Sequence, residues 1–214
     1  MSGRHYQKMK TIINVFMLLA ISLAARVTAG ESTLNVSYYP GVTIPEGNPV
    51  GVLDLERFNL AQSGDKVINL TVNLWLVGGY NGDLFVSLQA PDGTSVVLMN
   101  EPGVGVDGFG AAGAGMNITF ADDSPNLIQS ETSLMPLFGN YQPAELLAEF
   151  QGRPADGAWA LYCANLGIGD GPTTLVSWGM NITVLTAPEP TTNELGALAT
   201  LVLIAAKYRL KTSR

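Results

Sequence analysis

Residues 67–76, VINLTVNLWL, alternate between apolar and polar side chains with a period of two. The apolar positions are Ile68, Leu70, Val72, Leu74 and Leu76. The positions between them are Asn69, Thr71, Asn73 and Trp75. Successive side chains of a β-strand point to opposite faces, so this pattern predicts a strand with one buried and one exposed face. The chain shows almost no helical period, and the alternation therefore decides the fold class.

A second alternating stretch, Leu84–Gln89, is followed by Pro91-Asp92-Gly93-Thr94 and then by Val96 and Leu98. Pro, Asp and Gly favour a tight turn, so the two arms predict a β-hairpin. The same alternation recurs at residues 117–120, 158–164 and 176–185. Many short strands separated by turn residues predict an all-β fold, an antiparallel jelly-roll-like β-sandwich.

Several residues are assigned to the core of this sandwich. Trp159 and Cys163 share a strand face, and we interpret Cys163 as a buried, inert thiol. Residues 143–150, PAELLAEF, are expected to form a short helical turn, or a loop that tucks Leu146, Leu147 and Phe150 into the core.

The first 29 residues resemble a secretory signal peptide. Arg4, Lys8 and Lys10 precede an apolar segment at residues 12–25, and the small residues at 27–29 suit a cleavage site. An uncleaved membrane anchor is the alternative, but the apolar run is short for a span. We expect Gly30 to begin the mature chain.

Residues 188–214 form a second unusual segment. It contains Pro188-Glu189-Pro190, an apolar run at residues 195–206 and a basic tail. As a helix the apolar run reaches about 18 Å, against about 30 Å of bilayer hydrocarbon, which favours a sorting element over a stable anchor. The segment resembles the PEP-CTERM sorting signal of Gram-negative bacteria that make exopolysaccharide. That resemblance implies transient membrane insertion, an exosortase-type processing enzyme, and export to the outer surface or the extracellular matrix.

The segment between them, residues 30–187, has the length of a single domain and is strongly acidic. It holds three basic and sixteen acidic residues, a formal charge of −13. Phosphate binding needs a basic face, so we expect no nucleic-acid partner. Cations are natural partners of such a domain, and solubility outside the cell is the alternative reason for the charge.

The single histidine, His5, lies in the predicted signal peptide. The predicted mature domain therefore has no histidine. This excludes Ser-His-Asp and Cys-His catalysis, and it excludes zinc sites that need imidazole ligands. Acidic residues are plentiful, but no spacing among them supports paired-carboxylate hydrolysis. We expect that the protein is not an enzyme.

Candidate ligand-binding residues fall in the loops. Calcium prefers several hard oxygens, and loops rich in Gly, Asn and Asp supply them, so Asp83, Asp107, Asp122 and Asp123 are candidate calcium ligands. The alternative is that these aspartates cap turns. A G-x-G-x-x-G pattern at residues 103–108 is followed by a strand at residues 117–120 and not by a helix, so it does not indicate a nucleotide site.

The polar faces of the strands carry two further signals. Trp75 lies on the polar side of its strand and is a candidate for stacking on a sugar. Asn35, Asn69, Asn117 and Asn181 each begin an N-x-S/T triplet, which in a bacterial protein we interpret as the polar face of a strand and not as a glycan acceptor.

Spaced motifs between residues 41 and 185 together resemble the P domain (Homo B domain) that follows the catalytic domain of subtilisin-like proprotein convertases. They share their order and spacing with that family, and they read Ile44-Pro45-Glu46, Gly82-Asp83-Leu84, Pro91-Asp92-Gly93-Thr94, Thr119-Phe120-Ala121-Asp122, residues 147–152, residues 156–161 and residues 175–180. The family often has His-Thr-Tyr where this chain has Gly78-Gly79-Tyr80, and an aspartate where it has Asn165.

The resemblance implies a jelly-roll sandwich in which Trp159 and Trp178 are core or inter-sheet residues. It also implies that the domain stabilises a protease, partly through an apolar contact. Three functions follow as hypotheses. The first is a non-catalytic exported module that binds or structures the cell surface or the extracellular polymer. The second is an accessory that stabilises a subtilisin-like serine endopeptidase in trans, which predicts an apolar patch on one sandwich face. The third is a carbohydrate-binding jelly roll that uses Trp75.

Overall fold

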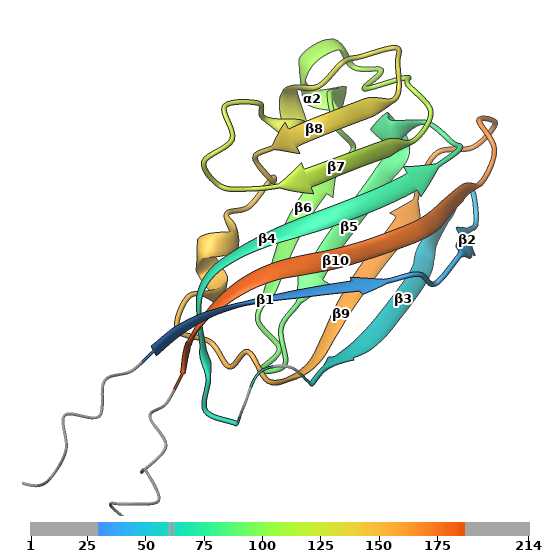
Figure 1. Cartoon of the computed structure of the whole chain (residues 1–214). Helices are drawn as coiled ribbons and strands as arrows, with labels where there is room; N and C mark the ends of the chain where they lie inside the picture. The colour runs from blue at the N-terminus through green and yellow to red at the C-terminus, as the bar shows by residue number, and fades with distance from the viewer. Residues whose placement is uncertain (1–29, 60, 62, 187–214) are drawn as a thin grey trace, which may run out of the picture. The chain divides into compact units, whose positions relative to one another are not determined.

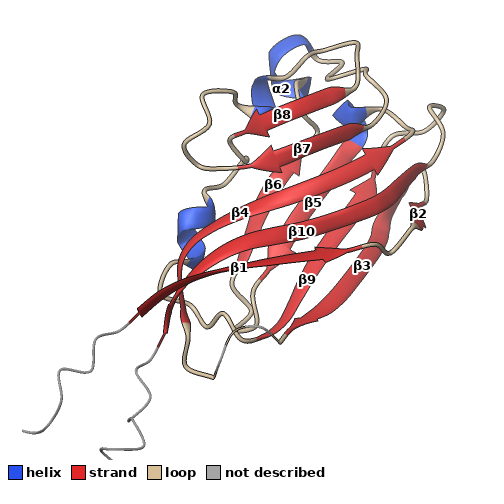
Figure 2. Cartoon of the chain, viewed as in Figure 1, coloured by secondary structure: helices blue, strands red, loops and turns tan. Residues whose placement is uncertain are grey.

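The computed structural model describes residues 30–59, 61 and 63–186. Ten strands make up most of this part of the chain, and the helices are single turns (Figure 2). The strands are β1 (Gly30–Tyr38), β2 (Val42–Ile44), β3 (Asn48–Phe58), β4 (Lys66–Val77), β5 (Leu84–Gln89), β6 (Ser95–Asn100), β7 (Met116–Phe120), β8 (Leu137–Tyr141), β9 (Gly157–Asn165) and β10 (Thr173–Thr186). The helical turns are η1 (Asn81–Asp83), α2 (Val104–Asp107), η2 (Ile128–Ser130) and η3 (Leu147–Phe150).

The strands form two sheets that pack face to face, which confirms the predicted all-β sandwich (Figure 1). The six-stranded sheet has the order β1-β10-β4-β7-β8, and β2 also pairs with β10. The four-stranded sheet has the order β3-β9-β5-β6. The strand pairs are antiparallel apart from β7 and β8, which run parallel. Figure 1 views the molecule from the outer side of the six-stranded sheet.

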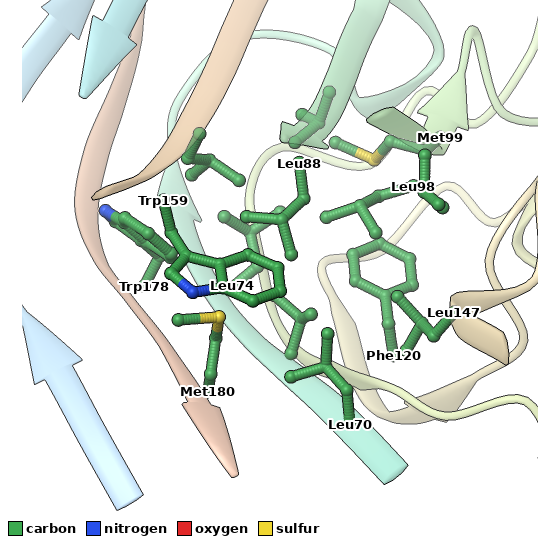
Figure 3. Close-up of a cluster of buried hydrophobic side chains, with 14 of the residues drawn as sticks. Leu70, Leu74, Leu88, Leu98, Met99, Phe120, Leu147, Trp159, Trp178 and Met180 are labelled. Carbon is green, nitrogen blue, oxygen red and sulfur yellow. The ribbon is translucent and has the colours of Figure 1, made fainter. Parts of the chain in front are cut away.

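The core lies between the two sheets and is built from the inward face of every long strand. Trp159 comes from the four-stranded sheet and Trp178 from the six-stranded sheet, and both are almost fully buried in the same cluster (Figure 3). Trp159 Nε1 donates a hydrogen bond to the Ala155 carbonyl at 3.0 Å. Trp178 Nε1 donates to Asp54 Oδ2 at 2.5 Å. Each indole therefore buries its apolar rings without leaving its N–H unsatisfied.

The predicted hairpin is present as β5 and β6, joined by a turn in which the Gly93 N–H donates to the Ala90 carbonyl at 3.0 Å. Cys163 is fully buried, as predicted, and burial raises the pKa of its thiol. An apolar environment disfavours the thiolate, which is the reactive form. The interpretation of Cys163 as an inert core residue agrees with this environment.

One local expectation was wrong, and a second was confirmed in part. Val67, and not Ile68, is buried at the start of β4, because a β-bulge opposite Thr183 and Val184 shifts the register there by one residue. The short helical turn expected within residues 143–150 is present as η3, in which Leu147 and Phe150 are buried. Leu146, which precedes η3, is 47% exposed and does not enter the core. The backbone of Leu146 is extended, so its side chain points away from that of its buried neighbour Leu147.

Leu74 and Asn73 are neighbours on β4 that point to opposite sides of the sheet, and they give a matched test of this packing. Leu74→Ala is expected to lower the free energy of unfolding by about 2–5 kcal/mol, because it leaves a cavity between the sheets. Asn73→Ala, at an exposed position, is expected to cost less than about 1 kcal/mol. Urea denaturation of the full chain measures both values, and equal costs for the two variants would contradict the assignment of faces.

Candidate functional site

One end of the sandwich brings together connections that are far apart in the sequence. The Leu166 N–H, in the β9–β10 connection, donates to the Asp83 carbonyl at 2.8 Å. In the same connection the Gly169 N–H donates to the Glu46 carboxylate, which belongs to the β2–β3 connection. These bonds tie three loops into one unit, and acidic side chains from different loops come close together there.

Asp83 is the central residue of this loop cluster. A Cβ atom placed on Gly167 would lie 1.9 Å from Asp83 Oδ2, so the carboxylate rests against backbone that only glycine leaves open. The carboxyl groups of Asp83 and Asp170 are close enough to share a hydrogen bond when one is protonated. Burial raises the pKa of Asp83, and the negative charges of Asp170, Glu101 and Glu46 raise it further.

Two buried asparagines flank Asp83. Asn81 belongs to η1 and donates through Nδ2 to the Gly115 carbonyl at 3.0 Å. Asn165 lies opposite Leu84 in the sheet and donates through Nδ2 to the Gly171 carbonyl at 3.3 Å. The Oδ1 atoms of both asparagines have no hydrogen-bond partner among the described residues. Buried oxygens of this kind and a repelling carboxyl pair are both groups that a hard cation stabilises.

The other predicted aspartates have local structural partners. Asp107 Oδ1 accepts hydrogen bonds from the Phe109 and Gly110 N–H groups, each at 2.8 Å, and so closes the turn after α2. The two carboxylate oxygens of Asp122 accept from the Leu147 and Ala148 N–H groups, each at 2.8 Å, which holds the start of η3 against β7.

Asp123 is exposed, and its position next to Asp122 does not bring it to the loop cluster around Asp83. Within the described part of the chain, no three His, Cys, Asp or Glu side chains are close enough to hold one metal ion. The structure therefore does not assemble the four predicted ligands into one site. Calcium binding stays a prediction, and Asp83 is the position at which it is tested.

Trp75 lies on the outer face of the six-stranded sheet and is 42% exposed. We call the outward positions in the central rows of this sheet the polar face. They are Thr33, Asn35 and Ser37 of β1, Asn69, Thr71, Asn73 and Trp75 of β4, Asn117 and Thr119 of β7, Phe138 and Asn140 of β8, and Ser177, Gly179, Asn181 and Thr183 of β10. None of these residues is charged; the charged outward residues Glu31 and Lys66 lie beyond them, on either side of Leu185. All four N-x-S/T triplets lie here, which confirms that they form the polar sides of strands.

The outer face of the four-stranded sheet has a different chemistry. Leu53 and Leu55, on the edge strand β3, are 65% and 62% exposed. Leu53 lies opposite Tyr162 of β9, and the Tyr162 ring contacts the Phe85 ring of β5 with centroids 5.8 Å apart. We call these four side chains the apolar face. Exposed leucines side by side with aromatic rings are typical of a surface that packs against another molecule.

The predicted sorting signal, Pro188-Glu189-Pro190, and the predicted signal peptide, residues 1–29, lie outside the described residues. Among residues 30–186, as far as they are described, no helix is long and apolar enough to span a bilayer. The processing of both ends therefore stays a prediction.

Comparison with known proteins agrees with the motifs. The model of the proprotein convertase P-domain family matches residues 67–182, more than half of the chain. The chain belongs to the proprotein convertase P-domain family. No curated protein sequence matches it.

Solved structures show similarity at low sequence identity. A chain in the complex of the Aeromonas sobria serine protease with the chaperone ORF2 is 15% identical, with a TM-score of 0.49 over 79% of this chain and 29% of that chain. The serine protease of Aeromonas sobria gives 15% identity and a TM-score of 0.46 over 77% of this chain and 29% of that chain. FLHE gives 16% identity and a TM-score of 0.41 over 74% of this chain and all of that chain. The chain thus spans less than a third of the first two.

Sequence reasoning missed the partners of Asp83. Glu101 and Asp170 were not singled out, and Glu46 was named only as part of a family motif, because each lies in a different loop and none belongs to a metal-binding pattern. The Gly-Asp-Gly stretch at residues 169–171 is a turn signal that could have drawn attention to Asp170. Phe138 was also missed, since the stretch around it lacks the alternation that marks the other strands.

Asp170→Asn is expected to stabilise the fold at neutral pH. The pKa of Asp83 is raised in the fold, so its contribution to stability is present below the usual carboxyl range and is lost as the pH rises through the raised pKa. Removing the Asp170 charge relieves the repulsion, by at most about 1 kcal/mol because solvent screens the pair. Thermal melts at pH 7 and pH 3 measure the difference in Tm between Asp170→Asn and the unmodified chain. An increase in Tm that is equally large at pH 3 would contradict the repulsion between the two carboxylates.

Calcium is expected to relieve the same repulsion in the unmodified chain. A site with a Kd near 10 µM adds about 2.7 kcal/mol at a hundredfold excess of ligand, roughly 5–11 °C in Tm. The measurement is a melt in EDTA and in millimolar calcium, with magnesium and Asp83→Asn as controls. An equal Tm in EDTA and calcium would leave Asp83 as a loop-forming residue only.

Proposed function

We propose that this protein is a non-catalytic, exported P-domain module that packs onto a subtilisin-like serine protease supplied in trans. The apolar face carries the proposal. Two adjacent leucines on an edge strand remain more than 60% exposed, although the same strand buries Phe58 completely. Fully burying a leucine side chain is worth about 1.5–3 kcal/mol, so this pair favours a protein partner with an apolar surface of its own.

Membership of the P-domain family supports the choice of partner. P domains accompany subtilisin-like proteases, and the apolar patch expected for a protease accessory is present on the four-stranded sheet. The chain itself has one histidine, His5, which precedes the family match. We therefore assign catalysis to the partner and support of the partner's fold to this chain.

Export is the second part of the proposal. The acidic domain lies between a signal-like N-terminus and a Pro-Glu-Pro tail. This order fits a protein that is held in the membrane transiently, is processed by an exosortase-type enzyme, and then reaches the surface of a Gram-negative cell. The intact mass of the secreted chain tests both ends, since cleavage would remove residues 1–29 at one end and part of residues 188–214 at the other.

A second candidate function, binding or structuring of the cell surface or extracellular polymer, is supported by the polar face. That face is uncharged, although residues 30–187 carry a net charge of −13. It lies on the other sheet, so the two functions do not compete for the same residues.

The protease proposal is tested by capture of the tagged full chain from the medium of the producing organism, followed by labelling with a fluorophosphonate probe that reacts with active-site serines. The expected result is a co-purified, probe-labelled protease, with no label on the chain itself. The double variant Leu53→Asp and Leu55→Asp is expected to lose the labelled partner, because it places two charges in the contact. Leu134→Asp, at a 78% exposed position before β8, is the matched control.

Loss of the partner in Leu134→Asp as well, or its retention in the double variant, would contradict the proposed contact. Label on this chain would contradict its non-catalytic assignment. Thermal melts of both variants show that any loss is not due to unfolding.

A further inference from the structure

We propose that the polar face binds a neutral, hydroxyl-rich polysaccharide chain, which lies across the strands on Trp75 and Phe138. The proposal deepens the second candidate function by naming its ligand, and it does not depend on the protease partner.

The two aromatic residues lie in one cross-strand row. Trp75 of β4 is opposite Asn117 of β7, and Asn117 is opposite Phe138 of β8. Two strand spacings separate the aromatic positions by roughly 10 Å. That separation is comparable with the length of a disaccharide, so two alternate sugar rings of one chain can each meet an aromatic side chain. Trp75 is 42% and Phe138 71% exposed.

The neighbouring row supplies the polar groups. Thr119 Oγ1 donates a hydrogen bond to Asn73 Oδ1 at 2.8 Å, which fixes the orientation of the amide. Asn140 is the next residue across the sheet in that row. Amides and hydroxyls both donate and accept hydrogen bonds, which suits sugar hydroxyls better than it suits a charged ligand.

Folding alone does not require the asparagine-rich composition of the polar face. Asparagine is depleted in β-strands, yet it takes outward positions on β1, β10, β4, β7 and β8. Any polar residue would keep these strands amphipathic, and charged residues, abundant elsewhere in the domain, would serve solubility better. An uncharged amide and hydroxyl surface therefore indicates a ligand.

The net charge of the domain distinguishes between the possible ligands of the polar face. An anionic polymer would be repelled by a domain with a net charge of −13, since like charges at a surface oppose association. A protein partner would favour a contiguous apolar core, which the polar face lacks but the opposite face has. A neutral polysaccharide meets neither objection.

The test is native affinity electrophoresis of the full chain in gels containing hydroxyethylcellulose, galactomannan or dextran, with alginate as the anionic polymer. At least one neutral polymer is expected to retard the chain, and alginate is not. Trp75→Ala and Phe138→Ala are each expected to weaken the retardation about tenfold, because each removes one stacking surface. Phe109→Ala, at an 87% exposed aromatic outside the strands, is the matched control and should bind normally.

Asn117→Asp provides a second variant that removes no core contact, because Asn117 is exposed. It places a negative charge between the aromatic positions and should also weaken retardation, while the thermal melt stays unchanged. Absence of retardation by every neutral polymer, or retardation that Trp75→Ala and Asn117→Asp leave intact, would overturn the proposal. So would a dimer in sedimentation that these variants dissociate, since the face would then bind a second copy of the chain.

Discussion

The structure depends on the burial of one side of every long strand between two sheets. The two tryptophans show what this burial requires: Trp159 and Trp178 enter the core from opposite sheets, and each N–H still finds an oxygen. Because side chains alternate with a period of two, each strand that fills the core also presents a second set of residues to the outside. The outer faces are therefore free to vary, and here they differ in chemistry. One is apolar at Leu53 and Leu55, and the other is rich in asparagine and uncharged in its central rows.

The loops at one end follow a different rule. Strand pairing fixes where each connection begins, but the contacts between connections depend on glycine. Gly167 leaves the space that the Asp83 carboxylate occupies, and the Glu46 carboxylate holds the same connection through the Gly169 N–H. Asp83 therefore both shapes the rim of the sandwich and carries a pKa raised by burial and by neighbouring acids. A side chain that had been expected either to close a turn or to bind a cation sits where both roles are physically possible.

Much of the fold could be predicted from the sequence, because alternation is a local signal. It indicated the faces of β4, the β5–β6 hairpin and the burial of Trp159 and Cys163, whereas the burial of Trp178 was expected only from the family resemblance. The bulge that buries Val67 in place of Ile68 could not be predicted, since it depends on the register with β10. Asp170 could not be assigned to Asp83 for a related reason: a contact between two loops is set by the sheet order, which alternation does not encode.

The arrangement of the two outer faces constrains how the proposed functions combine. In a two-layer sandwich the inner side chains fill about 10 Å between the sheets, so ligands on opposite faces cannot touch each other and need not exclude each other. A protease held on the apolar face would leave Trp75 and Phe138 free, and a polysaccharide on the polar face would leave Leu53 and Leu55 free. The same core that makes the chain stable thus separates two binding surfaces. A module of this kind can fix a soluble protease to a surrounding polymer without contributing any catalytic residue of its own.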